Sequence, residues 1–256
     1  MKAQSLSSST PRKRSKPSAA SASISAPERS AEQILAELQG LGTQRNIDGM
    51  AHFGIRAENV YGVSKPKLDE LAKRIGRNHA LALALWLTGN HDARILAGMI
   101  AEPRQITTAV MDLWVRDFNN WDICDGTCCH LFVFAKPAWS RALLWTRRKD
   151  EFQKRAGFAL AAYLAYRDKS ATDAPFEKFL KIIEREANDD RNFVRKAANW
   201  ALRNIGKRNL SLNRAAIATA LRIQKSDSRA AKWIAADALR ELRSEAVQSR
   251  LRRKKN

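Results

Sequence analysis

Apolar residues recur every three or four positions along most of the chain, which is the period of amphipathic helices. Ser30 and Gln33 have capping-box spacing ahead of an apolar run, so a helix is predicted over 30–41. A short helix and an ordered loop should follow over 50–66, then a helix from near Ser64 and another between Asn78 and Gly89. Further helices are predicted over 92–101, 105–117, 120–132, 139–147, 150–166, 174–187, 190–206, 211–224, 227–241 and 243–252. No alternating strand pattern interrupts them, which indicates an all-α fold.

The predicted helices repeat. Ala-Leu pairs begin at Ala159, Ala201 and Ala238, at steps of about 42 and 37 residues, which is the period of helical-hairpin repeats. A single hairpin cannot bury its own apolar face, so neighbouring hairpins stack into a curved solenoid. We therefore expect a helical-hairpin solenoid whose concave face is basic.

Composition divides the chain into a tail, a domain and a basic end. Residues 1–29 are rich in Ser, Ala, Pro and Lys/Arg, which predicts a disordered tail. Its basic cluster at 11–17 is compatible with a nuclear-import signal, but a phosphate-binding arm or a solubilising tail is favoured. The repeat domain is predicted over 30–242, and 243–256 should form a basic C-terminal helix or tail.

The charge of the chain points to a polyanionic partner. The 256 residues include 46 Lys plus Arg against 26 Asp plus Glu, a net charge of +20. The two ends, 1–29 and 222–256, carry +5 and +7, which leaves +8 for the body. No apolar run approaches the roughly 20 residues that cross a bilayer, so no membrane partner is expected. Three cysteines confined to 124–129 fit a reducing cytoplasm, or the nucleus in a eukaryote.

The stretch from Asn119 to His130 carries the most distinctive chemistry. If it is helical, Trp121 and Asp125 lie one turn apart on the same face. A carboxylate beside an indole in so basic a chain indicates a site for an electron-poor ligand.

A second pattern lies farther along the chain. Lys196, Trp200, Arg203 and Lys207 share one helix face, so the cations could neutralise phosphates while the indole packs on a sugar or base. The alternative is that Trp200 points into the core and the cations are a solvated face, and the spacing does not decide between them.

Arg155 is a third candidate. It could bind a phosphate through two parallel hydrogen bonds, but spacing alone favours an ion pair with the nearby Asp150 or Glu151.

Other chemistries find little support. Cys124, Cys128 and Cys129 lack a second ligand pair at zinc spacing, so we expect buried small side chains rather than a metal site. The four histidines are scattered, with no nucleophile in a recognisable setting, and there is no phosphate-binding glycine loop. We expect a monomer that needs no cofactor.

Several motifs together resemble the AlkD-like DNA alkylation repair proteins. The signature regions are Asn120-Trp-Asp-Ile-Cys-Asp125, Lys154-Arg-Ala-Gly-Phe-Ala-Leu160 and Phe193-Val-Arg-Lys-Ala-Ala-Asn-Trp-Ala-Leu-Arg203. Phe53-Gly-Ile, Tyr61-Gly-Val-Ser-Lys-Pro66 and Asp92-Ala-Arg94 fit the same family in the same order, and the likeness covers about 30–240.

The resemblance implies a HEAT-like repeat solenoid that grips duplex DNA and a glycosylase that removes cationic N3- or N7-alkylated purines. By the same resemblance, Asp125 is the catalytic carboxylate, Trp121 and Trp200 flank the lesion's sugar, and Arg155 contacts the DNA backbone. Lys196, Arg203 and Lys207 are expected to bind the backbone as well.

Two other functions remain open at the level of sequence. A non-catalytic solenoid that binds duplex or damaged DNA would share the basic face without depending on Asp125. A protein-interaction scaffold could use the same repeats, although the charge of +20 fits it poorly.

Overall fold

The computed structural model describes residues 30–253, and the tail predicted over 1–29 lies outside them. Within this range the regular structure is entirely helical, as the sequence predicts. The helices are α1 (Ala31–Leu41), α2 (Gln44–His52), α3 (Lys65–Ile75), α4 (His79–Leu87), α5 (His91–Ile100), η1 (Pro103–Gln105), α6 (Thr108–Trp114), η2 (Val115–Asp117), α7 (Trp121–His130), η3 (Phe132–Phe134), α8 (Ala138–Trp145), α9 (Glu151–Arg167), α10 (Asp173–Glu186), α11 (Asn192–Gly206), α12 (Leu210–Gln224), α13 (Arg229–Leu242) and α14 (Glu245–Arg253).

Side-chain caps set several helix boundaries. The Ser30 hydroxyl accepts from Gln33 N and the Gln33 side chain accepts from Ser30 N, which confirms the predicted capping box. The single helix predicted over 105–117 is wrong. The Thr107 hydroxyl caps α6 by accepting from Val110 N, so the segment divides into η1, α6 and η2.

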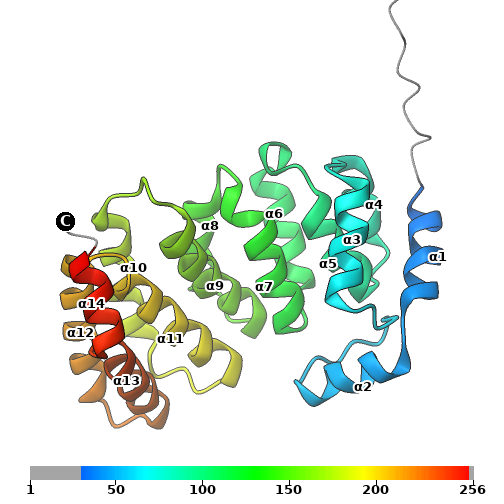
Figure 1. Ribbon diagram of the computed structural model, residues 1–256. Coiled ribbons are helices and arrows are strands. Elements are labelled where there is room, and N and C mark those ends of the chain that lie inside the picture. The colour runs from blue at the N-terminus through cyan, green and yellow to red at the C-terminus, as the bar shows by residue number, and fades with distance from the viewer. Residues whose placement is uncertain (1–29, 254–256) are drawn as a thin grey trace, which may run out of the picture.

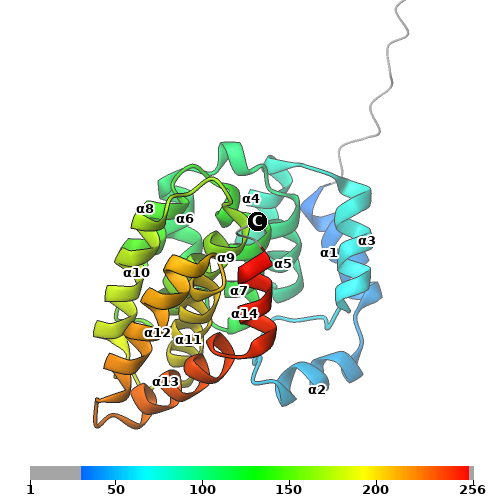
Figure 2. The ribbon, with the colours of Figure 1, turned by 60° about the vertical axis from the view of Figure 1, so that its left-hand side comes forward.

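The helices form two layers (Figures 1 and 2). In what we call the inner layer, α5, α7, α9, α11 and α13 each pack against the next. The outer layer comprises α4, α6, α8, α10 and α12, and of these α4, α8, α10 and α12 pack against the helix that follows them. The Ala-Leu pairs at Ala159, Ala201 and Ala238 lie in α9, α11 and α13 and are buried. They therefore mark successive inner helices, which confirms the predicted hairpin repeat.

One continuous apolar core runs between the layers from Ile34 to Leu242. It contains Trp86 and Trp114, whose rings stack with 3.9 Å between their centroids. Trp86 Nε1 donates a hydrogen bond to Asp117, and Trp145 Nε1 donates one to Asp112. The buried indoles of Trp86 and Trp145 therefore each have a carboxylate acceptor. Every helix in residues 30–253 is too short or too polar to cross a lipid bilayer.

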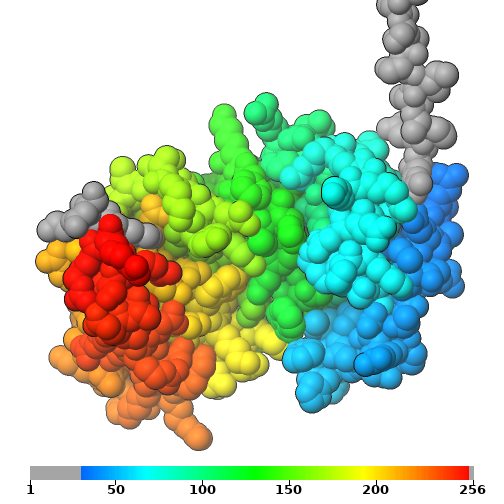
Figure 3. All heavy atoms as spheres, viewed as in Figure 1, coloured from blue at the N-terminus to red at the C-terminus, as the bar shows by residue number. Residues whose placement is uncertain are grey.

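The first hairpins are fastened by a buried carboxylate. Asp92, at the start of α5, accepts backbone hydrogen bonds from Tyr61, Gly62 and Val63. These contacts tie the loop after α2 to the inner layer. In the space-filling view, the surface of α7 (green) lies between α2 (blue) and α11 (yellow) (Figure 3).

Candidate functional site

Helix α7 presents Trp121 and Asp125 on one face, as the sequence predicts. Asn120 starts the helix, because its side chain accepts hydrogen bonds from the backbone of Asp122 and Ile123. Trp121, Asp125 and Cys129 then follow at i, i+4 and i+8 and are partly exposed, whereas the opposite face is buried. The three side chains form one strip along α7.

The carboxylate of Asp125 is bound by Arg155 of α9. Arg155 Nε donates to Asp125 Oδ1 at 2.9 Å and Nη2 donates to Oδ2 at 2.7 Å, so the pair is bidentate. Arg155 Nη1 donates to the backbone oxygen of Phe193 at 2.8 Å. This contact joins α7, α9 and α11 around one buried guanidinium.

The prediction from spacing that Arg155 forms an ion pair with Asp150 or Glu151 is therefore wrong. Asp150 instead caps α9 by accepting from the backbone of Phe152 and Gln153, and Glu151 accepts from Phe193 N. Asp150 thus binds N–H groups that the first turn of α9 leaves unsatisfied, and Glu151 binds one in the first turn of α11.

Burial and charge act against each other in this pair. Burial raises the pKa of Asp125 above its ordinary value, and the attraction and hydrogen bonds of Arg155 offset only part of that effect. Burial also disfavours the Arg155 cation, but Asp125 outweighs it and raises the pKa of the guanidinium. The site thus holds a fixed positive group behind a carboxylate that protonates more readily than an exposed Asp.

Two tryptophans and a tyrosine lie on α7, α9 and α11, the three helices that the Arg155 contacts join. Trp121 Nε1 donates to the backbone oxygen of Phe53 at 3.0 Å, which ties the end of α2 to the start of α7. Trp200 is half-buried and meets the ring of Tyr163 edge-on, with 4.8 Å between the ring centroids. Trp200 therefore packs on the core and still exposes part of its indole. Its packing on a sugar or base stays a prediction.

Tyr163 and Phe193 were not predicted to belong to the site. Tyr163 lies two turns after Arg155 on α9, and burial, followed by the neighbouring Cys129, raises the pKa of its hydroxyl. The Phe193 ring lies 5.9 Å from the Arg155 guanidinium, and a methyl group added at Gly54 would approach it to 3.6 Å. The helical spacing from Arg155 could have identified Tyr163, but no local signal identifies Phe193.

The predicted cationic stripe on α11 lies on one face, but two of its cations are already paired. Arg203 and Lys207 both bind Glu241 of α13, with Lys207 Nζ at 2.5 Å from Oε1. Lys196 is exposed, and within residues 30–253 no acid pairs with it. Binding of phosphates by Arg203 and Lys207 remains a prediction, and it would compete with these ion pairs.

The cysteines lie mostly in the interior. Cys124 and Cys128 are fully buried, with their sulfur atoms near the backbone oxygens of Phe152 and Ala156, which confirms their use as small core side chains. Cys129 is half-buried. In residues 30–253, no three His, Cys, Asp or Glu side chains gather as a metal site would require.

A cavity of about 470 Å³ is lined in part by Trp121. Its lining comes from α2, α3, α5 and α7 and includes Phe53, Ile55, Leu68 and His130. Burial, followed by the positive charge of Lys65, lowers the pKa of His130. Trp121 thus lines this mainly apolar cavity, whereas Asp125 and Arg155 are not among its lining residues.

Comparisons with known proteins agree with this architecture. The sequence model of a protein family described as "DNA alkylation repair enzyme" matches residues 34–242. One similar solved structure is described as "A new family of proteins related to the HEAT-like repeat DNA glycosylases with affinity for branched DNA structures". It shares 23% sequence identity and a TM-score of 0.71, covering 87% of this chain and 96% of that chain, which confirms the HEAT-like repeat fold. No curated protein matches the chain.

Proposed function

Because the chain belongs to the DNA alkylation repair enzyme family, we propose that it is a DNA glycosylase that removes cationic N3- or N7-alkylated purines from duplex DNA. The observation that carries the proposal is the partly exposed Asp125 carboxylate, which Arg155 holds on the same face of α7 as Trp121. The test is release of 7-methylguanine from a duplex under single-turnover conditions. Release above the spontaneous rate supports the proposal, and no release of either 7-methylguanine or 3-methyladenine opposes it.

The chemistry suits a single carboxylate. Alkylation at a ring nitrogen makes the purine cationic, so when the bond from C1′ to the base breaks, the bonding electrons neutralise the departing base. The sugar passes through an oxocarbenium-like state, which a negative charge stabilises. In our proposal Asp125 supplies that charge and orients a water, whose oxygen bonds to C1′ and whose proton passes to the carboxylate or to solvent.

Arg155 would act chiefly as a positioning residue. Its hydrogen bonds to Asp125 and to Phe193 O use three of its five N–H groups. They fix the carboxylate in one orientation and favour its ionised form. Contact with a phosphate of the bound strand, the role that the family resemblance assigns to Arg155, stays a prediction, because Arg155 is only 7% exposed.

Replacing Trp200 should slow base release. Trp200→Leu keeps an apolar side chain but removes the π-face that would contact a cationic sugar or base. Such contacts are worth about 0.5–2 kcal/mol, so the single-turnover rate should fall by roughly 2- to 30-fold. Fluorescence anisotropy should show duplex affinity changed by less than about threefold, since the cations remain. An unchanged rate would remove Trp200 from the site.

The pH dependence of base release should reveal the protonation of the Asp125 carboxylate. Because the pKa of Asp125 is raised, its carboxylate protonates at a higher pH than an ordinary Asp, whose pKa is about 3.9. Protonation removes the catalytic charge, so the rate should fall as the pH decreases through that raised pKa. The measurement is the single-turnover rate from pH 4 to 8 after subtraction of spontaneous release. A rate that does not fall on approaching pH 4 would contradict this assignment.

A non-catalytic DNA-binding solenoid is the second candidate. One observation favours it, because Arg155 already neutralises much of the charge of Asp125. The similar solved structure is also described as having affinity for branched DNA. Tight duplex binding without base release would select this alternative.

A further inference from the structure

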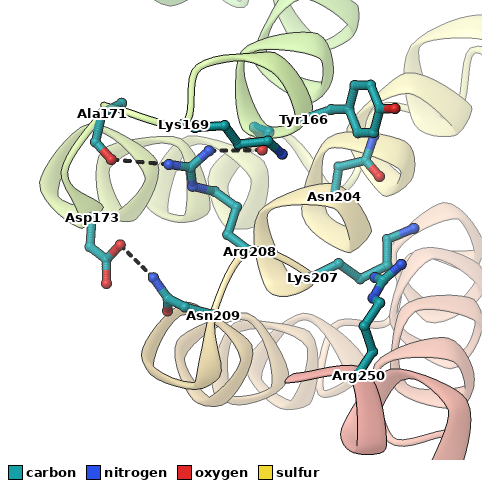
Figure 4. A pocket seen from close by; sticks show the side chains of 10 residues that line it. Tyr166, Lys169, Ala171, Asp173, Asn204, Lys207, Arg208, Asn209 and Arg250 are labelled. Atoms are coloured by element: carbon teal, nitrogen blue, oxygen red, sulfur yellow. Dashed lines mark hydrogen bonds between the residues drawn. The ribbon is translucent and has the colours of Figure 1, made fainter. Parts of the chain in front are cut away.

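A second cavity lies at the other end of the inner layer, between the ends of α9 and α11 and the C-terminal helix α14 (Figure 4). Its volume is about 460 Å³. Tyr166 and Lys169 stand on one side of it, and Lys207 and Arg250 stand on the other. Cations from three separate segments therefore converge on one hollow.

Two of these cations have no acidic partner. Within residues 30–253, neither Lys169 nor Arg250 forms an ion pair, whereas Lys207 is bound to Glu241. Arg208 donates to the backbone oxygens of Ala165, Asp168 and Ala171 and so builds the wall of the cavity. Lys169 and Arg250 are thus available to bind an anion.

An exposed aromatic ring accompanies the cations. Tyr166 is 62% exposed, and Lys169 Nζ and the Arg167 guanidinium lie 5.1 and 5.4 Å from its ring centre. The Arg167 guanidinium also lies 5.7 Å from the ring of Phe134, which is 51% exposed. Exposed aromatic rings among cations are typical of surfaces that bind the sugars, bases and phosphates of nucleic acids.

The cavity shares a face with the Asp125–Arg155 pair. Arg155 and Tyr166 are eleven residues apart on α9, so three turns of helix return them to nearly the same direction. At 1.5 Å per residue they are separated by about 16 Å along the helix. A DNA molecule lying against α9 could therefore contact both places at once.

We propose that this cavity binds a phosphodiester group of the DNA strand that flanks the lesion, held by Lys169 and Arg250. Tyr166 packs on the adjoining sugar or base. The inference rests on the proposed function in assuming that DNA lies across the inner layer. The site adds affinity and fixes where the DNA lies, but it takes no part in breaking the glycosidic bond.

The test is the double variant Lys169→Ala/Arg250→Ala. Duplex affinity should fall about tenfold, and the slope of log affinity against log salt should become shallower by about 0.9, the change expected when one phosphate is no longer neutralised. The matched control is Lys178→Ala/Lys181→Ala on the outer helix α10, which removes the same charge from exposed positions. It should leave affinity and slope near wild type.

Unchanged binding by Lys169→Ala/Arg250→Ala would overturn the proposal, as would an equal loss in the control pair, which would reflect net charge alone. Tyr166→Ala gives a further check, since it should weaken binding without changing the salt slope. Affinity and slope are measured independently of base release. A wild type that binds duplex but releases no base would contradict the glycosylase and still leave the phosphate site supported or refuted by these variants.

Discussion

Asp125→Asn should lower the single-turnover rate of 7-methylguanine release by about 100-fold or more. The substitution keeps the shape of the side chain and removes the negative charge that we propose stabilises the sugar. It does not remove any cation that could contact DNA, so duplex affinity should be unchanged or slightly higher. Base release and fluorescence anisotropy on the same duplex measure the two effects separately.

Asp122→Asn provides the matched control. Asp122 lies on the same helix, its side chain is 40% exposed, and it contacts His91 Nε2 at 3.3 Å rather than Arg155. Its rate should stay within about threefold of wild type, as surface substitutions usually have small effects. Equal losses from Asp122→Asn and Asp125→Asn would mean that the general acidity of α7, and not one carboxylate, supports base release.

Instability must be separated from chemistry, because Asp125→Asn leaves Arg155 buried without its charged partner. Breaking a buried ion pair costs about 3–5 kcal/mol. The double variant Asp125→Asn/Arg155→Met removes both charges and should recover part of the lost thermal stability. It should recover none of the base release. Recovery of activity together with stability would show that Asp125 acts only on the fold.

The fold was largely predictable because its determinants are local. Helical periodicity and caps such as Ser30 depend on residues three or four positions apart. Trp121 and Asp125 share a face for the same reason. The prediction of a single helix over 105–117 was wrong because the apolar periodicity continues through the Thr107 cap and the flanking 3-10 turns.

The connections of the site could not be predicted in this way. Arg155 binds a carboxylate 30 positions away on α7 instead of the acids beside it, and Arg203 binds Glu241, 38 positions away on α13. Both contacts depend on how successive inner helices align, which no local pattern specifies. A count of charges in the sequence also includes Arg203 as a free cation, although Glu241 of the next repeat neutralises it.

The alignment of α9 depends on a close approach at Gly157, so Gly157→Ala should lower the stability markedly. A methyl group there would lie 2.5 Å from the backbone nitrogen of Thr146 and 3.0 Å from the backbone oxygen of Ala142. Backbone atoms cannot turn aside as a side chain can, so α8 and α9 must separate. We expect a loss of about 3 kcal/mol and a melting temperature lower by about 5 °C or more, measured by circular dichroism.

Gly40→Ala is the control for that substitution, because no atom lies within 4 Å of the added methyl group. Its helix should gain up to about 1 kcal/mol from the better propensity of Ala. Gly157 lies two residues after Arg155, so moving α9 also moves the guanidinium that holds Asp125. Folded Gly157→Ala protein should therefore release base more slowly, whereas Gly40→Ala should not. A destabilised Gly157→Ala protein with a wild-type rate would show that the ion pair tolerates displacement of its helix, which would weaken the positioning role of Arg155.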